Sequence, residues 1–82
     1  MQLLIRGSVG PKVKELQQNL VALGYDVRVD GTYGQTTEEA ITDFQDKQNI
    51  GIDGSYGPDT HEKLMEALAA LEEEEEGGEE GQ

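Results

Sequence analysis

Few side chains in this sequence are able to do covalent chemistry. Nucleophilic catalysis needs a serine or cysteine beside a base, and the chain has two serines, Ser8 and Ser55, no cysteine and one histidine, His61. Both serines fall in glycine-rich segments and are predicted to be turn residues. Glu38 and Glu39 are carboxylates of the kind used in glycoside hydrolysis, but consecutive residues on an exposed helical turn point apart and stay solvated. The sequence therefore predicts no catalytic residue.

One turn has part of the pattern of a calcium-binding EF-hand loop. Asp26, Asp30 and Gly31 take positions 1, 5 and 6 of that pattern. Position 3 is Arg28, where an oxygen ligand is required, and position 12 is Thr37 in place of the bidentate glutamate. A chain with no cysteine and one histidine also lacks the ligands of an ordinary structural zinc site. We therefore expect no metal and no cofactor, and we expect Asp30 to brace its turn by accepting backbone N–H bonds.

Tyr33 and Tyr56 are the side chains best suited to bind a ligand. Each precedes a glycine that opens an expected helix, and free N–H groups at a helix start favour a carboxylate. A tyrosine offers an apolar face to a sugar or a methyl group, and a hydroxyl for a hydrogen bond. Packing in a small core is the alternative role for both rings. His61 is expected to pack on its helix or to contact a ligand, and Gln17 and Gln45 to bond loop backbone or a ligand.

The two tyrosines belong to a motif that occurs three times in the chain. Segments starting at Ile5, Val29 and Ile52 each read β-branched residue, charged residue, Gly, Ser or Thr, a larger residue, Gly, at offsets of 24 and 23 residues. That period has room for one loop and one short helix. The first glycine of each copy is expected to hold positive φ or to allow a close backbone approach. The short alternations before these glycines are expected to turn one apolar side chain inward: Leu3 and Ile5, Val27 and Val29, Ile50 and Ile52.

An amphipathic stretch follows each copy. The first spans 11–23 between Gly10 and Gly24, with Pro11 where a missing N–H costs nothing; the second spans about 35–48, and the third starts at Pro58. Apolar residues recur at helical spacing in all three. In the first they are Val13, Leu16, Leu20 and Leu23. The predicted fold is all-α: a compact three-helix bundle with glycine-rich repeated loops and little or no sheet.

The net charge of −12 is concentrated at the C-terminal end. Residues 72–82 hold seven of the eighteen acids, so residues 1–71 carry eleven acids against six bases. We expect one domain over 1–71 and a disordered acidic tail or truncated linker over 72–82, with the third helix fraying into the glutamates. This balance argues against a nucleic-acid partner, which requires clustered Lys and Arg. No apolar run approaches the ~18 residues of a membrane span, and the first residues lack the features of a signal peptide.

The order of these motifs resembles the peptidoglycan-binding-domain-like family of bacterial and phage cell-wall hydrolases. The family's Gly-Ser-x-Gly entry and its Val-x-x-Leu-Gln-x-x-Leu-x-x-Leu-Gly-Tyr helix are matched by residues 7–10 and 13–25. Its Asp-Gly-x-Tyr/Phe-Gly-x-x-Thr-x-x-Ala-Val-x-x-Phe-Gln pattern is matched by residues 30–45. A second Asp-Gly-x-x-Gly-Pro-x-Thr is matched by residues 53–60. The resemblance covers residues 3–71, and His61 stands where the family often has an aromatic residue.

The resemblance implies a non-catalytic module that targets an associated hydrolase or a phage particle to the stem peptide or glycan of bacterial peptidoglycan. It would be a monomer, acting at the cell wall or in the extracellular or periplasmic space, and without a signal peptide it would be phage-encoded or excised from a longer protein. The expected site is a groove at the Asp30–Thr37 loop: Asp30, Gly31, Tyr33, Gly34, Thr37, Tyr56 and Thr60. A protein–protein interaction or assembly module on the same fold is the alternative, favoured by the negative charge, which anionic wall polymers would repel.

Overall fold

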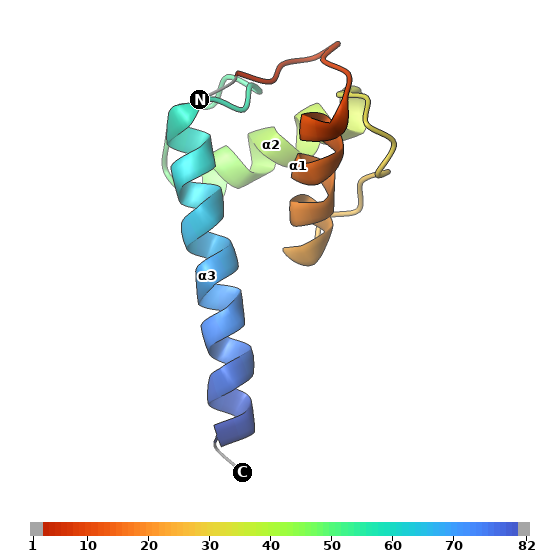
Figure 1. The fold of residues 1–82 in the computed structure, drawn as a ribbon. Helices are drawn as coiled ribbons and strands as arrows, with labels where there is room; N and C mark the ends of the chain where they lie inside the picture. Colours follow the sequence, from red (N-terminus) through yellow and green to blue (C-terminus); the bar gives the residue numbers. More distant parts are fainter. Residues whose placement is uncertain (1–2, 81–82) are drawn as a thin grey trace.

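Three helices joined by glycine-rich loops make up the fold in the computed structural model (Figure 1). The structure describes the backbone of residues 3–80 and the side chains of residues 3–72. Helix α1 spans Pro11–Ala22, α2 spans Gln35–Lys47 and α3 spans Pro58–Glu80. Within residues 3–80 the β-pairing is limited to isolated bridges between loops. The prediction of an all-α fold with little or no sheet is therefore confirmed.

The helix boundaries follow from the residues that flank them. Gly10 is the N-cap of α1, with a φ of 137°, and Pro11 is its first residue. A proline at this position is favourable because its fixed φ suits the helix and its missing N–H would have had no partner. After the last turn, Gly24 has a φ of 99°, the left-handed conformation that commonly closes a helix. The predicted start and end of this helix are confirmed.

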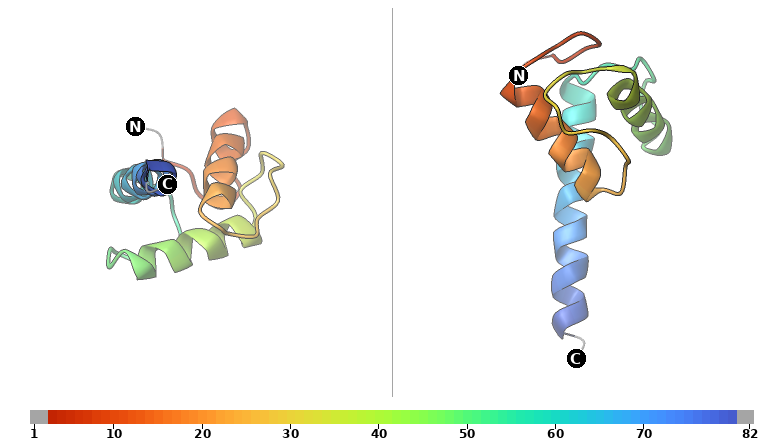
Figure 2. Two further views of the ribbon diagram at one scale, coloured as in Figure 1. Left: turned by 90° about the horizontal axis from the view of Figure 1, so that it is seen from below. Right: turned by 90° about the vertical axis from the view of Figure 1, so that its right-hand side faces the viewer.

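The helices pack around one core, with α1 beside α3 and α2 running across both (Figures 1 and 2). Each helix turns one apolar face inward, and the loops add their own side chains. The buried apolar residues are Val13, Leu16 and Leu20 of α1, Ala40, Ile41 and Phe44 of α2, Leu64 of α3, and Leu4, Val27, Tyr33 and Tyr56 of the loops. Burial of this apolar surface is the main stabilising contribution in a chain without disulfides.

The N-terminal segment buries a different residue from the ones expected. Leu4 is 5% exposed, whereas Leu3 and Ile5 are 56% and 45% exposed. The backbone N–H of Leu4 donates to the carbonyl of Tyr56 at 3.1 Å, and the N–H of Tyr56 donates to the carbonyl of Leu4 at 2.8 Å. This reciprocal bridge fixes the register of the segment. Because side chains alternate in extended backbone, Leu4 points inward and its two neighbours point outward.

Helix α3 is longer than the sequence pattern predicted. It runs to Glu80, past the glutamates into which it was expected to fray, and gives the molecule extents of 45 × 26 × 22 Å. Glutamate is a good helix former, and each added residue brings one more backbone hydrogen bond. Residues 81 and 82 and the side chains of 73–80 lie outside the described part, so the separate acidic tail of 72–82 stays a prediction. Within the described chain, none of the helices has the length and apolarity to cross a membrane.

Candidate binding groove

A buried glutamine of α1 holds the first glycine loop in position. Gln17 is 0% exposed, and its Oε1 accepts the backbone N–H groups of Asp30 at 3.0 Å and Gly31 at 2.8 Å. Its Nε2 shares two hydrogens among three oxygens: Asp30 Oδ1 at 3.1 Å, the Thr32 carbonyl at 2.9 Å and Thr37 Oγ1 at 3.0 Å. One side chain thus fixes the loop and the first turn of α2.

The same arrangement recurs one repeat later. Gln45 of α2 accepts the N–H groups of Asp53 and Gly54 at 3.2 and 3.0 Å. Its Nε2 lies 2.9 Å from each of three oxygens, Asp53 Oδ1, the Ser55 carbonyl and Thr60 Oγ1. Helices α1 and α2 therefore each carry a glutamine whose side-chain amide orders the loop that follows the helix. The prediction that these two glutamines bond loop backbone is confirmed.

The two loop aspartates close their own turns. Asp30 Oδ1 accepts the N–H of Thr32 at 3.0 Å, and Asp53 Oδ1 accepts the N–H of Ser55 at 2.9 Å. These backbone bonds, followed by the glutamine amides, hold the pKa of both carboxyl groups below the ordinary value. Among the side chains described, no cluster of three or more His, Asp or Glu is placed to hold a metal ion. The predicted bracing role of Asp30 is confirmed.

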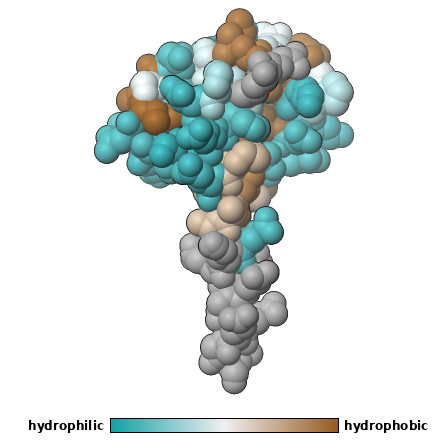
Figure 3. Space-filling view, turned by 60° about the vertical axis from the view of Figure 1, so that its left-hand side comes forward, coloured by the Kyte–Doolittle hydropathy of each residue, from teal (hydrophilic) through white to brown (hydrophobic). Residues whose placement is uncertain are grey.

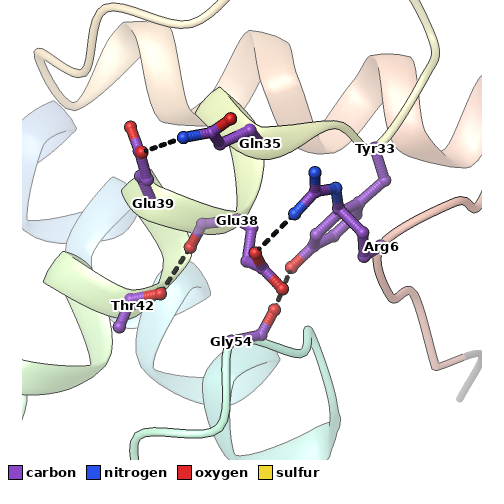
Figure 4. Close-up of polar contacts among 7 residues, drawn as sticks. All are labelled: Arg6, Tyr33, Gln35, Glu38, Glu39, Thr42 and Gly54. Atoms are coloured by element: carbon purple, nitrogen blue, oxygen red, sulfur yellow. Dashed lines mark hydrogen bonds and ion pairs between the residues drawn. The ribbon is translucent and has the colours of Figure 1, made fainter.

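Tyr33 links the first loop to the second from inside the molecule. Its ring is 1% exposed and its hydroxyl donates to the Gly54 carbonyl at 2.7 Å (Figure 4). Burial, and then the nearby carboxylates of Glu38 and Asp53, raise the pKa of this phenol. Beside it, Arg6 and Glu38 form an ion pair of 2.9 Å on the surface (Figure 4). Of the two roles considered for Tyr33, the structure shows packing.

A groove of about 500 Å³ opens between α1 and α3. The bridged residues Leu4 and Tyr56 line it together with one face of each helix. The lining residues are Leu4, Lys12, Glu15, Leu16, Asn19, Tyr56, His61, Met65 and Leu68. The spacing explains the two walls: positions 12, 15, 16 and 19 share one face of α1, and positions 61, 65 and 68 share one face of α3.

The groove changes character along its length. Both helices start at the loop end of the molecule (Figure 1), so the early residues Lys12, Glu15 and His61 lie nearest that end. At the opposite end α3 contributes the apolar Met65 and Leu68, and α1 contributes the amide side chain of Asn19. Ligand sites commonly combine an apolar lining with a few polar groups that fix orientation. This groove has that composition.

Tyr56 and His61 form a rigid pair in the groove wall. The Tyr56 hydroxyl lies 2.6 Å from His61 Nδ1, and the two rings meet edge to face with centroids 5.7 Å apart. Tyr56 is 6% exposed. Burial raises its pKa to about 12, and the carboxylate of Glu15 adds to this shift.

The structure separates the seven residues predicted for the site. Tyr56 lines the groove, whereas Tyr33, Thr37 and Thr60 are at most 3% exposed and are used in internal hydrogen bonds. Gly31 is buried and donates its backbone N–H to Gln17, Asp30 is exposed, and Gly34 is the N-cap of α2. Contact of these six residues with a ligand stays a prediction.

Sequence reasoning considered His61 for a ligand contact but missed other wall residues of α1 and α3. Lys12, Glu15 and Asn19 on one helix and Met65 on the other have helical spacing that is visible in the sequence. The repeated motif drew attention to the loops because it is the distinctive pattern. That the two helix faces lie opposite one another depends on the packing of α1 against α3, which no local pattern encodes.

The chain is similar to several known proteins. Residues 9–64 match the family described as "Putative peptidoglycan binding domain". The chain is 39% identical over 59 residues, 72% of its length, to the carboxy-terminal processing protease CtpA of Bacillus subtilis (strain 168), and spans 13% of that protein.

Two solved structures have the same fold. The SleB N-terminal domain is 39% identical, with a TM-score of 0.77 over 80% of this chain and 92% of that one. A fused zinc-dependent amidase/peptidase/peptidoglycan-binding-domain protein of Clostridium acetobutylicum ATCC 824 is 40% identical, with a TM-score of 0.74 over 77% of this chain and 28% of that one. With the three helices, the braced loops and the match over residues 9–64, the chain belongs to this family of peptidoglycan-binding domains.

Proposed function

We propose that this chain is a non-catalytic module that binds bacterial peptidoglycan through the groove between α1 and α3. The observation that carries the proposal is a groove of about 500 Å³ with charged and apolar walls in a chain of this family. Its volume falls within the ~300–1,000 Å³ range of small-molecule sites. The groove thus suits a fragment of the wall polymer.

The groups available for catalysis support the absence of an enzymatic role. The Oγ of Ser8 accepts the backbone N–H of Ile5 at 3.0 Å, which holds it in its turn. The Nδ1 of His61 is engaged with the phenol of Tyr56, and Glu38 is paired with Arg6. None of these contacts joins a serine hydroxyl to the imidazole of His61, which a serine nucleophile requires.

We further propose that the module serves a wall hydrolase to which it is attached. The Clostridium protein combines amidase, peptidase and peptidoglycan-binding regions, and the present chain spans only a minor part of it. A tethered binding module raises the local concentration of its enzyme at the polymer without any new contact in the active site. Its place of action would be the cell wall, and the module itself would be a monomer.

Co-sedimentation with purified sacculi tests the proposal. Met65 lines the groove and is 39% exposed, whereas Val21 of α1 is 45% exposed and lies outside the groove. Because both Met65→Glu and Val21→Glu add one exposed carboxylate to a helix, they form a matched pair. We expect the wild type and Val21→Glu to pellet with sacculi, and Met65→Glu to bind about tenfold more weakly. A wild-type chain that stays in the supernatant at low salt contradicts the proposal.

A protein-interaction module is the second candidate. The favouring observation is a set of exposed apolar side chains at the loop end, where Figure 3 shows apolar residues gathered. Leu3, Val9 and Ile52 are 56%, 74% and 54% exposed. The same experiment separates the two candidates, because this one expects retention on a protein partner and none on sacculi.

A further inference from the structure

One positively charged and one negatively charged side chain of α1, Lys12 and Glu15, line the groove. Lys12 and Glu15 are three residues apart on α1, which places their Cβ atoms about 5–6 Å apart on the same face. Among the described side chains, the ion pairs are Arg6 with Glu38, Lys47 with Asp43, and Lys63 with Glu66. Neither Lys12 nor Glu15 belongs to one of these pairs, and both are exposed residues that line the groove.

The remaining lining favours a peptide over a sugar. A sugar ring packs best on the flat face of an exposed aromatic side chain, but the Tyr56 ring is 6% exposed and meets His61 edge to face at 79°. The accessible apolar lining is aliphatic: Met65 is 39% exposed and Leu68 is half-buried. Such side chains bury the methyl groups of alanine residues well.

We propose that the groove binds uncross-linked stem peptides, with Glu15 contacting the free side-chain ammonium of the diamino acid and Lys12 contacting a carboxylate of the same peptide. The alanine methyl groups pack at the end formed by Met65 and Leu68. This inference rests on the proposed function and specifies which part of the polymer is recognised.

Charge complementarity is the reason for the preference for uncross-linked stems. A cross-link converts the side-chain ammonium of one stem into an amide and uses the terminal carboxyl group of another. Each conversion removes one charge from the ligand. Glu15 or Lys12 would then face a neutral group, and a charge-assisted hydrogen bond would be lost.

A cycle of ligand and protein changes tests the inference. The ligand is a synthetic tetrapeptide stem, L-Ala–γ-D-Glu–diamino acid–D-Ala, with its side-chain amine either free or acetylated. Affinities come from chemical-shift titration of the 15N-labelled chain. For the wild type we expect acetylation to weaken binding about three- to tenfold. For Glu15→Gln we expect acetylation to change the affinity less than about twofold, because the charge that senses the ammonium is absent.

Lys12→Gln should weaken binding of both peptides by a similar factor, and Lys14→Gln is its matched control. Lys14 is exposed on the same helix and does not line the groove, so its variant should bind as the wild type does. Because the ligand change leaves the protein intact, a variant that fails to fold does not prevent the test.

Three results would overturn the inference. Equal affinity for the free and acetylated peptides shows that the ammonium is not recognised. Binding of peptide-free glycan strands, with no shifts on adding the stem peptide, places recognition on the sugar while co-sedimentation with sacculi, and with it the proposed function, still stands. Failure to sediment with sacculi removes the proposed function and this inference together.

Discussion

Two amide side chains, Gln17 and Gln45, hold the loops of this domain. Each is buried and joins a helix to the loop that follows it through both its carbonyl and its amino group. The sequence has no cysteine, so no disulfide is available to order the loops. A buried polar group that satisfies several partners at once costs much more to remove than an exposed one.

Replacing Gln17 with leucine is therefore expected to be strongly destabilising. Gln17→Leu leaves the N–H groups of Asp30 and Gly31 without their acceptor, and we expect the free energy of unfolding to fall by about 3 kcal/mol. Urea denaturation followed by circular dichroism measures the change. Gln18→Leu, at the exposed neighbouring position, is the matched control and should change stability by less than about 0.5 kcal/mol. Equal losses of stability in the two variants would argue against a role of the Gln17 amide in ordering the loop.

The loop aspartates give stability a dependence on acid pH. The folded state lowers the pKa of Asp30 and Asp53 below the ordinary 3.8, so their contribution is present above about pH 4 and is lost as pH falls through the folded-state pKa. We expect Asp30→Asn with Asp53→Asn to reduce the acid-induced loss of stability. Urea denaturation at several values between about pH 2 and pH 6 tests this. Asp46→Asn, at an exposed position of α2, is the control for the loss of one surface carboxylate.

At the level of the elements, the helix starts and the loop glycine conformations could be predicted from the sequence, whereas the end of α3 could not. The apolar stripes and the Gly-Pro entries fixed the helix starts at Pro11 and Pro58, because capping is decided by neighbouring residues. Positive φ at Gly31 and Gly54 also followed from local turn chemistry. The end of α3 did not, since a run of glutamates combines mutual repulsion with high helix propensity and the balance is not visible in the pattern.

A pair of glycine substitutions tests the loop conformation. Gly31 has a φ of +78° and an added Cβ would meet the Gly10 carbonyl oxygen at 3.5 Å, whereas Gly51 lies in open space without positive φ. We expect Gly31→Ala to lower the midpoint of thermal unfolding, at a cost of about 1–2 kcal/mol. Gly51→Ala should be neutral or stabilise by up to about 1 kcal/mol. A Gly31→Ala variant as stable as the wild type would show that this conformation is not required.

At the level of the whole molecule, the groove is the feature that sequence reasoning did not find. Tyr56 was the one predicted site residue that lines it, because its loop packs between α1 and α3. Lys12, Glu15 and Met65 carry no motif of their own. Their relation comes from the packing of two helices separated by more than thirty residues of chain. Family motifs identified the fold, and long-range packing produced the surface.

The tyrosines link alkaline titration to global unfolding. Burial is the largest cause that raises the pKa of Tyr25 and Tyr56 to about 12, and it raises that of Tyr33 as well. A group whose pKa is higher in the folded state stabilises it below the unfolded value of about 10, and that contribution is lost as pH rises further. We therefore expect tyrosinate absorbance and loss of helix to rise together above about pH 11. In urea the tyrosines should titrate near pH 10, and native helix that persists after full ionisation would contradict this coupling.

Two backbone hydrogen bonds between Leu4 and Tyr56 connect the first described segment of the chain to a loop that lines the groove. The amide protons of these two residues exchange with solvent when the hydrogen bonds break, and a ligand packed against Tyr56 would oppose that opening. We therefore expect the hydrogen–deuterium exchange of these two amides to slow when a ligand occupies the groove, so that their exchange rates report on binding.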